Sequence, residues 1–177
     1  MSIQVHKSLP IKGCSLWLLE NDKPVSSTPQ ADNISITIPS IEFETTDVGI
    51  MGTVSIPDFS RVGNLQLTAT IAIDNPDSRV LKRVGHQSWM IRYCTSSMNV
   101  NTGLEELSSY TIKASGYITS IPNAEVNQGA ENTGDIVMNL MSFQKLHDTD
   151  VEINIDRMAG KLEISGINYA SEISSLY

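Results

Sequence analysis

The sequence has few basic residues, few cysteines and no long hydrophobic run. Its 177 residues include 12 Lys and Arg against 20 Asp and Glu, which gives a net charge of −8. General binders of nucleic acid or acidic lipid need clustered Lys and Arg, so this balance argues against both classes. The two cysteines, Cys14 and Cys94, are too few for a disulfide framework. They could pair with each other, but we expect them to be buried free thiols.

Signals for export and membrane insertion are also missing. Residues 1–13 lack an apolar core of signal-peptide length, and the nearest strongly apolar run, residues 16–19, is far too short to span a bilayer. We therefore expect the chain to be made and folded in the cytoplasm, without inserting into a membrane.

Recognisable catalytic and metal-binding patterns are absent as well. His6, His86 and His147 are far apart and lack metal-ligand spacing, and the chain has neither a G-x-S-x-G motif nor a P-loop. Asp148-Thr149-Asp150 begins like a calcium loop, but Ile153 stands where that loop requires glycine. These absences predict that the protein is not an enzyme and uses no metal or other cofactor.

Hydrophobic residues alternate with polar ones along most of the chain, which is typical of strands with one solvated face. The alternation predicts strands at residues 34–38, 65–73, 89–93, 110–114, 151–155 and 162–164. Residues 136–143 are apolar on both faces, so we expect a strand there that is covered on both sides. The fold class predicted is a mostly β, antiparallel sandwich or barrel, formed as a single domain over residues 1–177.

One short α-helix is predicted at about residues 75–85. Asn75 suits the N-cap, Pro76 suits the first helical position, and Gly85 suits the left-handed position after the last turn. Val80, Leu81 and Val84 should share one face that packs on the sheet. The helix also carries basic residues, which either form a face exposed to solvent or contact an acidic neighbouring protein; they are Arg79, Lys82 and Arg83.

Residues 39–57 predict a long protruding β-hairpin. The alternation changes phase at Pro39, and Pro57 interrupts the return arm, so each proline should mark a kink where an arm leaves the sheet. Acidic residues, Glu42 and Glu44, occupy the polar face of the first arm. The tip is apolar and flanked by glycines, which favours contact with a partner over exposure; it comprises Val48, Gly49, Ile50, Met51 and Gly52.

These features together resemble the major tail tube protein of contractile-tailed phages and of phage-tail-like bacteriocins such as the R-type pyocins. The similarity lies in the segment Ile36-Thr37-Ile38-Pro39, the long arm and its tip, and Val54-Ser55-Ile56-Pro57. The single mid-chain helix also resembles that family, as do the strands at residues 152–156 and 161–168 and the C-terminal tail at about residues 166–177.

The resemblance implies antiparallel β-sandwiches that join into six-membered rings, which stack into a hollow tube inside a contractile sheath. Its implied partners are other copies of the chain, the sheath, the tape measure protein, the baseplate hub and the tail terminator. The tube would conduct DNA in a phage, without specific binding, or ions in a bacteriocin. The finished product would be a virion tail or a released particle.

The acidity of the chain has a role in this interpretation. Six chains at −8 would give 6 × −8 = −48 per ring, and acidic groups facing the lumen would repel phosphate. Glu42 and Glu44 are the first candidates for the lining, the alternative being an ordinary solvated strand face. Other possible functions are a type VI secretion tube protein, a monomeric ligand-binding β-barrel and an enzyme.

Overall fold

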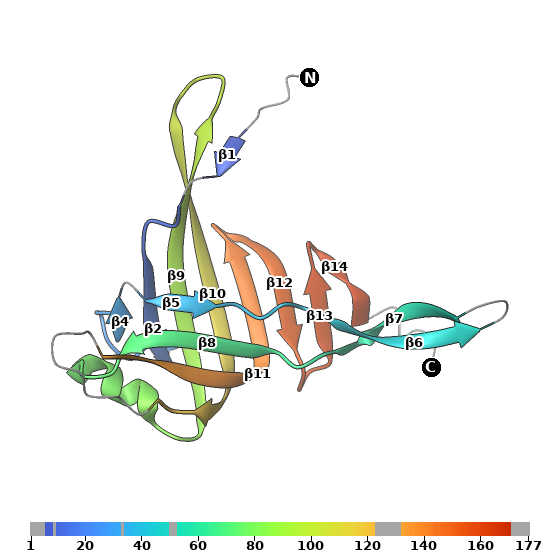
Figure 1. The fold of residues 1–177 in the computed structure, drawn as a ribbon, viewed down its shortest axis with the longest axis horizontal. Helices are drawn as coiled ribbons and strands as arrows, with labels where there is room; N and C mark the ends of the chain where they lie inside the picture. The colour runs from blue at the N-terminus through green and yellow to red at the C-terminus, as the bar shows by residue number, and fades with distance from the viewer. Residues whose placement is uncertain (1–5, 9, 33, 50–52, 123–131, 171–177) are drawn as a thin grey trace.

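The structure of the chain, a computed structural model, describes residues 6–8, 10–32, 34–49, 53–122 and 132–170. These residues form short strands near the N-terminus, three long strands in the middle and a short 3₁₀ helix (Figure 1). In chain order the elements are β1 (His6–Ser8), β2 (Cys14–Glu20), β3 (Lys23–Pro24), β4 (Ala31–Asp32), β5 (Ser35–Thr37), β6 (Phe43–Gly49), β7 (Thr53–Val62), β8 (Gln66–Ala72), η1 (Pro76–Lys82), β9 (His86–Asn99), β10 (Glu105–Ser120), β11 (Thr133–His147), β12 (Asp150–Asp156), β13 (Lys161–Ile164) and β14 (Ile167–Asn168).

The strands pair in antiparallel fashion in one large sheet, ordered β14-β13-β12-β11-β10-β9-β2-β3. β8 pairs with the first half of β11, and β5 pairs with β8, so these strands lie across β9 and β10 (Figure 1). The expectation of a mostly β, antiparallel fold is confirmed. Each predicted strand is present, although β9, β10 and β11 are much longer than the alternation indicated.

The core lies between these two layers, where alternate residues of each strand point inward. Trp89 is fully buried, and its indole nitrogen donates to Oε1 of Gln87 over 2.8 Å. Other buried side chains come from β2, β8, β9, β10 and β11, and they include Leu16, Leu67, Ile71, Ile91, Ile112, Ile136, Met138 and Phe143.

A bulge in β11 lets this strand serve both layers. Its buried side chains fall on even positions up to Leu140 and on an odd position at Phe143, because the pairing with β10 shifts between Ser115↔Ser142 and Gly116↔Leu140. The other face of the strand, expected to be covered, is only half-buried at Val137 and Met141.

The mid-chain helix forms where predicted, and its start follows the predicted chemistry. Asn75 caps it by accepting from the Asp77 amide over 2.9 Å, with Pro76 as the first residue. It is a 3₁₀ helix and ends at Lys82, however, so Gly85 is not its C-terminal cap. Of the predicted apolar face, Leu81 is buried and Val80 half-buried, but Val84 lies beyond the helix and is 83% exposed.

Gly116 permits the close approach of β10 to the bulge. A Cβ atom there would lie 2.0 Å from the Asn139 carbonyl oxygen, a backbone atom that cannot move without disrupting the sheet. We expect Gly116→Ala to destabilise the fold by about 1–3 kcal/mol or more, which lowers the melting temperature by roughly 2–12 °C. Gly13→Ala is the control, because a Cβ at Gly13 meets nothing within 4 Å. Equal melting temperatures for the two variants would contradict this account.

Candidate subunit interfaces

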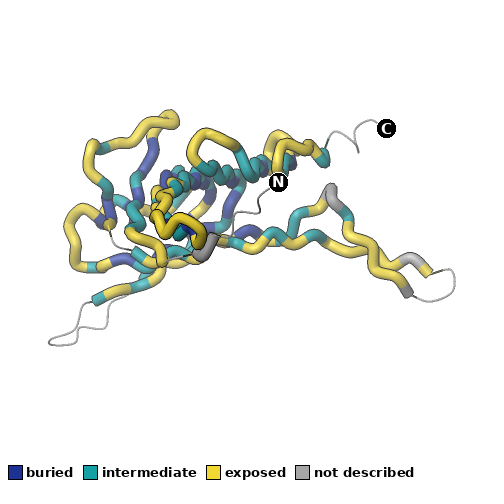
Figure 2. The backbone as a smooth tube through the Cα atoms, turned by 90° about the horizontal axis from the view of Figure 1, so that it is seen from above, coloured by how far each residue is buried: buried dark blue, intermediate teal, exposed yellow. Residues whose placement is uncertain are grey.

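The predicted hairpin is present as β6 and β7, which form a two-stranded sheet of their own. It extends away from the body of the molecule, and most of its described residues are exposed (Figures 1 and 2). Val54 and Ile56 are 61% and 49% exposed, so the hairpin presents apolar side chains to solvent. Of the predicted tip, residues 50–52 lie outside the described residues.

The kink predicted on the return arm is misplaced. Pro57 lies within β7 and pairs with Thr45, while the pairing shifts from Glu44↔Asp58 to Phe43↔Val62. The irregularity therefore falls between Asp58 and Val62. The first arm agrees with the expectation, since β5 ends at Thr37, before Pro39, and β6 begins at Phe43.

Hydrogen bonds close the base of the hairpin and tie it to the body. The Gly63 amide donates to the Glu42 carbonyl over 2.7 Å, and the Arg157 guanidinium donates to the carbonyls of Val62 and Gly63. Because Arg157 belongs to the turn between β12 and β13, these bonds tie the hairpin to the edge of the main sheet.

The two acidic candidates, Glu42 and Glu44, are both exposed at the start of the hairpin. The Glu42 carboxylate accepts from the Ser40 hydroxyl over 3.1 Å. The Glu44 carboxylate lies 3.5 Å from the Arg61 guanidinium, which also lies 3.7 Å from Asp58. Surface ion pairs of this kind contribute little to stability, but they hold the carboxylate of Glu44 beside a positive charge.

The basic residues of η1 divide into two groups. The Lys82 ammonium donates to the Ile73 carbonyl, so it helps to hold the helix on the body. Gln87 holds the helix end by donating to the carbonyls of Leu81 and Arg83. Arg79 and Arg83 are exposed, and they remain candidates for contact with another protein.

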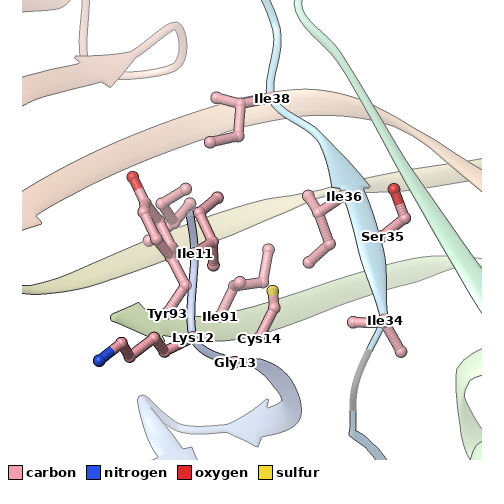
Figure 3. A pocket seen from close by; sticks show the side chains of 11 residues that line it. Ile11, Lys12, Gly13, Cys14, Ile34, Ser35, Ile36, Ile38, Ile91 and Tyr93 are labelled. Atoms are coloured by element: carbon pink, nitrogen blue, oxygen red, sulfur yellow. The ribbon is translucent and has the colours of Figure 1, made fainter. Parts of the chain in front are cut away.

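An apolar pocket of about 550 Å³ lies between β5 and the strands β2 and β9 (Figure 3). Isoleucines dominate its wall, with Lys12, Cys14, Ser35 and Tyr93 as its polar members. Burial raises the pKa of Tyr93 to about 12. The Tyr93 ring stacks on the Tyr110 ring with centroids 5.0 Å apart, and the Tyr110 ring stacks in turn on the His147 ring with centroids 4.6 Å apart. Such a lining suits packing more than acid–base chemistry.

The two cysteines are free, as predicted, but they differ in burial. Cys14 is half-buried in the pocket wall, whereas Cys94 is exposed and not buried as expected. They lie on neighbouring strands, where Cys14 is paired with Tyr93. Consecutive residues of a strand point to opposite faces, so Cys94 points away from the pocket.

Two further properties concern only the described residues. Among them, no group of three or more His, Cys, Asp and Glu side chains is arranged to hold a metal ion. The same residues contain no helix that is long and apolar enough to cross a membrane.

Comparison with known proteins identifies the family. A family model for the phage tail tube protein FII matches residues 27–175, nearly the whole chain. The chain belongs to this family. It is therefore a structural subunit of a tail tube, as the resemblance implied, and its family consists of tube components and not of enzymes.

Solved structures similar to this chain include a tube-containing assembly. The chain resembles a subunit in the cryo-EM structure of an extracellular contractile injection system, the PVC sheath-tube complex in its extended state, with a TM-score of 0.48 and 12% identity. The match covers 78% of this chain and 91% of that one. No curated protein matches the sequence.

The pocket predicts a difference in thiol reactivity. Burial raises the pKa of Cys14 to about 11, so at pH 8 only about one molecule in a thousand carries the reactive thiolate. In Cys94→Ser, iodoacetamide should modify Cys14 slowly at pH 8 and faster as the pH approaches 11. In Cys14→Ser, Cys94 should react quickly. Mass spectrometry over time measures both rates, and equal rates at pH 8 would show that the pocket is open to water.

Proposed function

We propose that copies of this chain join edge to edge into six-membered rings, and that the rings stack into the hollow inner tube of a contractile phage tail or a phage-tail-like bacteriocin. Membership of the tail tube family carries this proposal. The tube forms inside a sheath and conducts DNA or ions after contraction, and the chain itself catalyses no reaction.

The strand edges support assembly by sheet extension. The main sheet ends at β14 on one side and at β3 on the other, and both strands are only two residues long. A strand edge exposes unpaired backbone groups that favour pairing with another chain. Closing the sheets of several copies into a ring removes these edges, as in a β-barrel.

The β6–β7 hairpin is the second assembly element. Its exposed Val54 and Ile56 would become buried when the hairpin packs on a neighbouring subunit. The predicted tip joins the two arms in the sequence and is apolar in composition; it comprises Val48, Gly49, Ile50, Met51 and Gly52. The hairpin thus reaches from one subunit to the next.

Acidic residues of the subunit give the lumen its charge. At −8 per chain the rings repel phosphate, so duplex DNA passes without binding. Glu42 and Glu44 are the proposed lining residues, and Arg61 partly neutralises Glu44. At physiological salt the repulsion acts within about 8 Å of the wall.

The remaining partners follow from the same assembly. They are the sheath that surrounds the tube, the tape measure protein, the baseplate hub and the tail terminator. Assembly takes place in the bacterial cytoplasm, before the tail or particle is released. Arg79 and Arg83 face either the sheath or a neighbouring subunit.

Assembly of the purified chain tests this function. We expect rings or long tubes at high concentration and moderate salt, measured by analytical ultracentrifugation and negative-stain electron microscopy. Val54→Asp should prevent the hairpin from docking, because it places a charge in an apolar contact, while the subunit still melts cooperatively. The matched control is Val54→Ile, which should assemble normally. A wild-type chain that stays monomeric would overturn the tube assignment in favour of a ligand-binding barrel.

The role of the two acids is tested separately. Replacing Glu42 and Glu44 by Gln removes 2 × 6 = 12 charges from each six-membered ring at nearly constant side-chain shape. Substitutions at exposed sites have small effects, so we expect tubes that melt within about 2 °C of wild type. The corresponding Lys pair should assemble but bind phosphate, with slower DNA release or altered ion selectivity. Tubes that dissociate on Glu→Gln would instead identify the acids as partners in an intersubunit ion pair.

A further inference from the structure

The pair of β9 and β10 forms a second protrusion, distinct from the β6–β7 hairpin. Its tip rises beyond the sheet, where β1 pairs with it through Ser8↔Ser97 and His6↔Asn99 (Figure 1). The turn is rigidly held, because the buried Asn99 side chain accepts from the amides of Asn101 and Thr102. The Asn99 amide also donates to the Leu104 carbonyl over 2.9 Å. The tip therefore has a defined shape before any partner binds.

This rigid tip exposes apolar side chains. Val100, Leu104 and Leu107 are 53%, 66% and 68% exposed, and we call these three residues the tip patch. Neighbouring exposed apolar residues on a well-ordered element usually mark a binding surface. Ordering the tip costs no further entropy on binding, which favours such a role.

The opposite end of the same two strands carries a second apolar surface. Val84 is 83% exposed just before β9, and Ile121 is exposed just after β10. Tyr117 is also exposed and packs edge-on against His86, with ring centroids 5.4 Å apart. We call Val84, Tyr117 and Ile121 the base patch.

The ladder between β9 and β10 keeps these two patches apart. Its register runs unbroken from Glu105↔Met98 near the tip to Tyr117↔His86 near the base. A strand of the length of β9 spans about 45 Å. The tip patch and the base patch of one copy therefore cannot contact each other, but those of two stacked copies can.

Charge complementarity between the two ends indicates what covers each patch. Glu105 and Glu106 open β10 beside the tip, where both are exposed. Glu105 also forms an ion pair with Lys12 of the same chain, so this end carries a net negative charge of one from these three groups. Arg79 and Arg83 are exposed beside the base patch, in and just after η1. Stacking two copies tip to base brings acidic residues to basic residues, whereas tip-to-tip or base-to-base contact brings together like charges.

We propose that the tip patch of one subunit packs against the base patch of a subunit in the next ring, so that the β9–β10 pair forms an axial contact of the tube. This inference rests on the proposed tube function and names a second copy of the chain as the partner. Because the contact joins two different surfaces, it repeats from ring to ring without closing. The axial repeat of the tube is then comparable to the length of β9, about 45 Å, and any tilt of the strands within a barrel shortens it.

Two single substitutions test the contact, one on each patch. Leu104→Asp and Val84→Asp alter exposed side chains, so both variants should melt like the wild type. Each variant alone should form rings but lose filaments in negative-stain images. The controls are Leu104→Met and Val84→Ile, which keep each patch apolar and should retain filaments.

Mixing preformed rings of the two variants gives the decisive result. A Val84→Asp ring still has an intact tip patch, and a Leu104→Asp ring still has an intact base patch, so one contact can form between them. We expect stacks of two rings and no longer filaments. Filaments from either variant alone, or no pairs in the mixture, would overturn the inference.

Other outcomes separate this inference from the proposed function. If the wild-type chain forms no rings, the tube function and the axial contact that rests on it are both overturned. If the Val84→Asp variant forms normal tubes that no longer bind the sheath, the base patch is a sheath contact and the axial contact is wrong.

Discussion

The antiparallel pairing of β9 with β10 is the interaction on which the rest of the structure depends. Its unbroken ladder supports the core on one face, through Trp89, Ile91 and Ile112. Along its edges it carries β2 and β11, and through them the remaining strands of the main sheet. A paired ladder of this length resists bending, so it fixes how far apart the two ends of the subunit lie. Two of the exposed apolar surfaces, the tip patch and the base patch, lie at the ends of this rigid pair.

The second constraint is the bulge between β10 and β11, which turns one sheet into two layers. Without the extra residue in β11, the buried face would continue on even positions and Phe143 would point out of the core. Gly116 makes the bend possible because it leaves room for the Asn139 carbonyl. The same bend directs β8 and β5 across the ladder. This change of register between β10 and β11 thereby encloses the core between the two layers.

A tube subunit needs a stable body and surfaces that are incomplete until another copy binds. Here the body is the sandwich, and the incomplete surfaces are the strand edges, the β6–β7 hairpin and the two ends of β9–β10. The described contacts between the β6–β7 hairpin and the body lie near its base, where Arg157 donates to the carbonyls of Val62 and Gly63 and where Phe43 and Val62 pack against the core. The β9–β10 tip, by contrast, continues the central strands. The extended β6–β7 hairpin and the rigid β9–β10 pair therefore differ in how they can contact a neighbour, and a stacked assembly can use both.

The sequence alone determined the order of most long strands and the place of the short helix, because those depend on local physics. Alternation identified β5, β8, β9, β10, β12 and β13 but not β2. Asn75 and Pro76 identified the start of the helix, and the change of alternation phase at Pro39 identified the β6–β7 hairpin. The family resemblance could also be seen from that order. Tertiary structure decided what depends on distant partners: the register of β9 with β10, the bulge at Gly116, the exposure of Val84 and Cys94, and the irregularity near Asp58. It also placed Leu104 and Val84 at opposite ends of one ladder, since side-chain exposure follows from what packs nearby and not from the residue type.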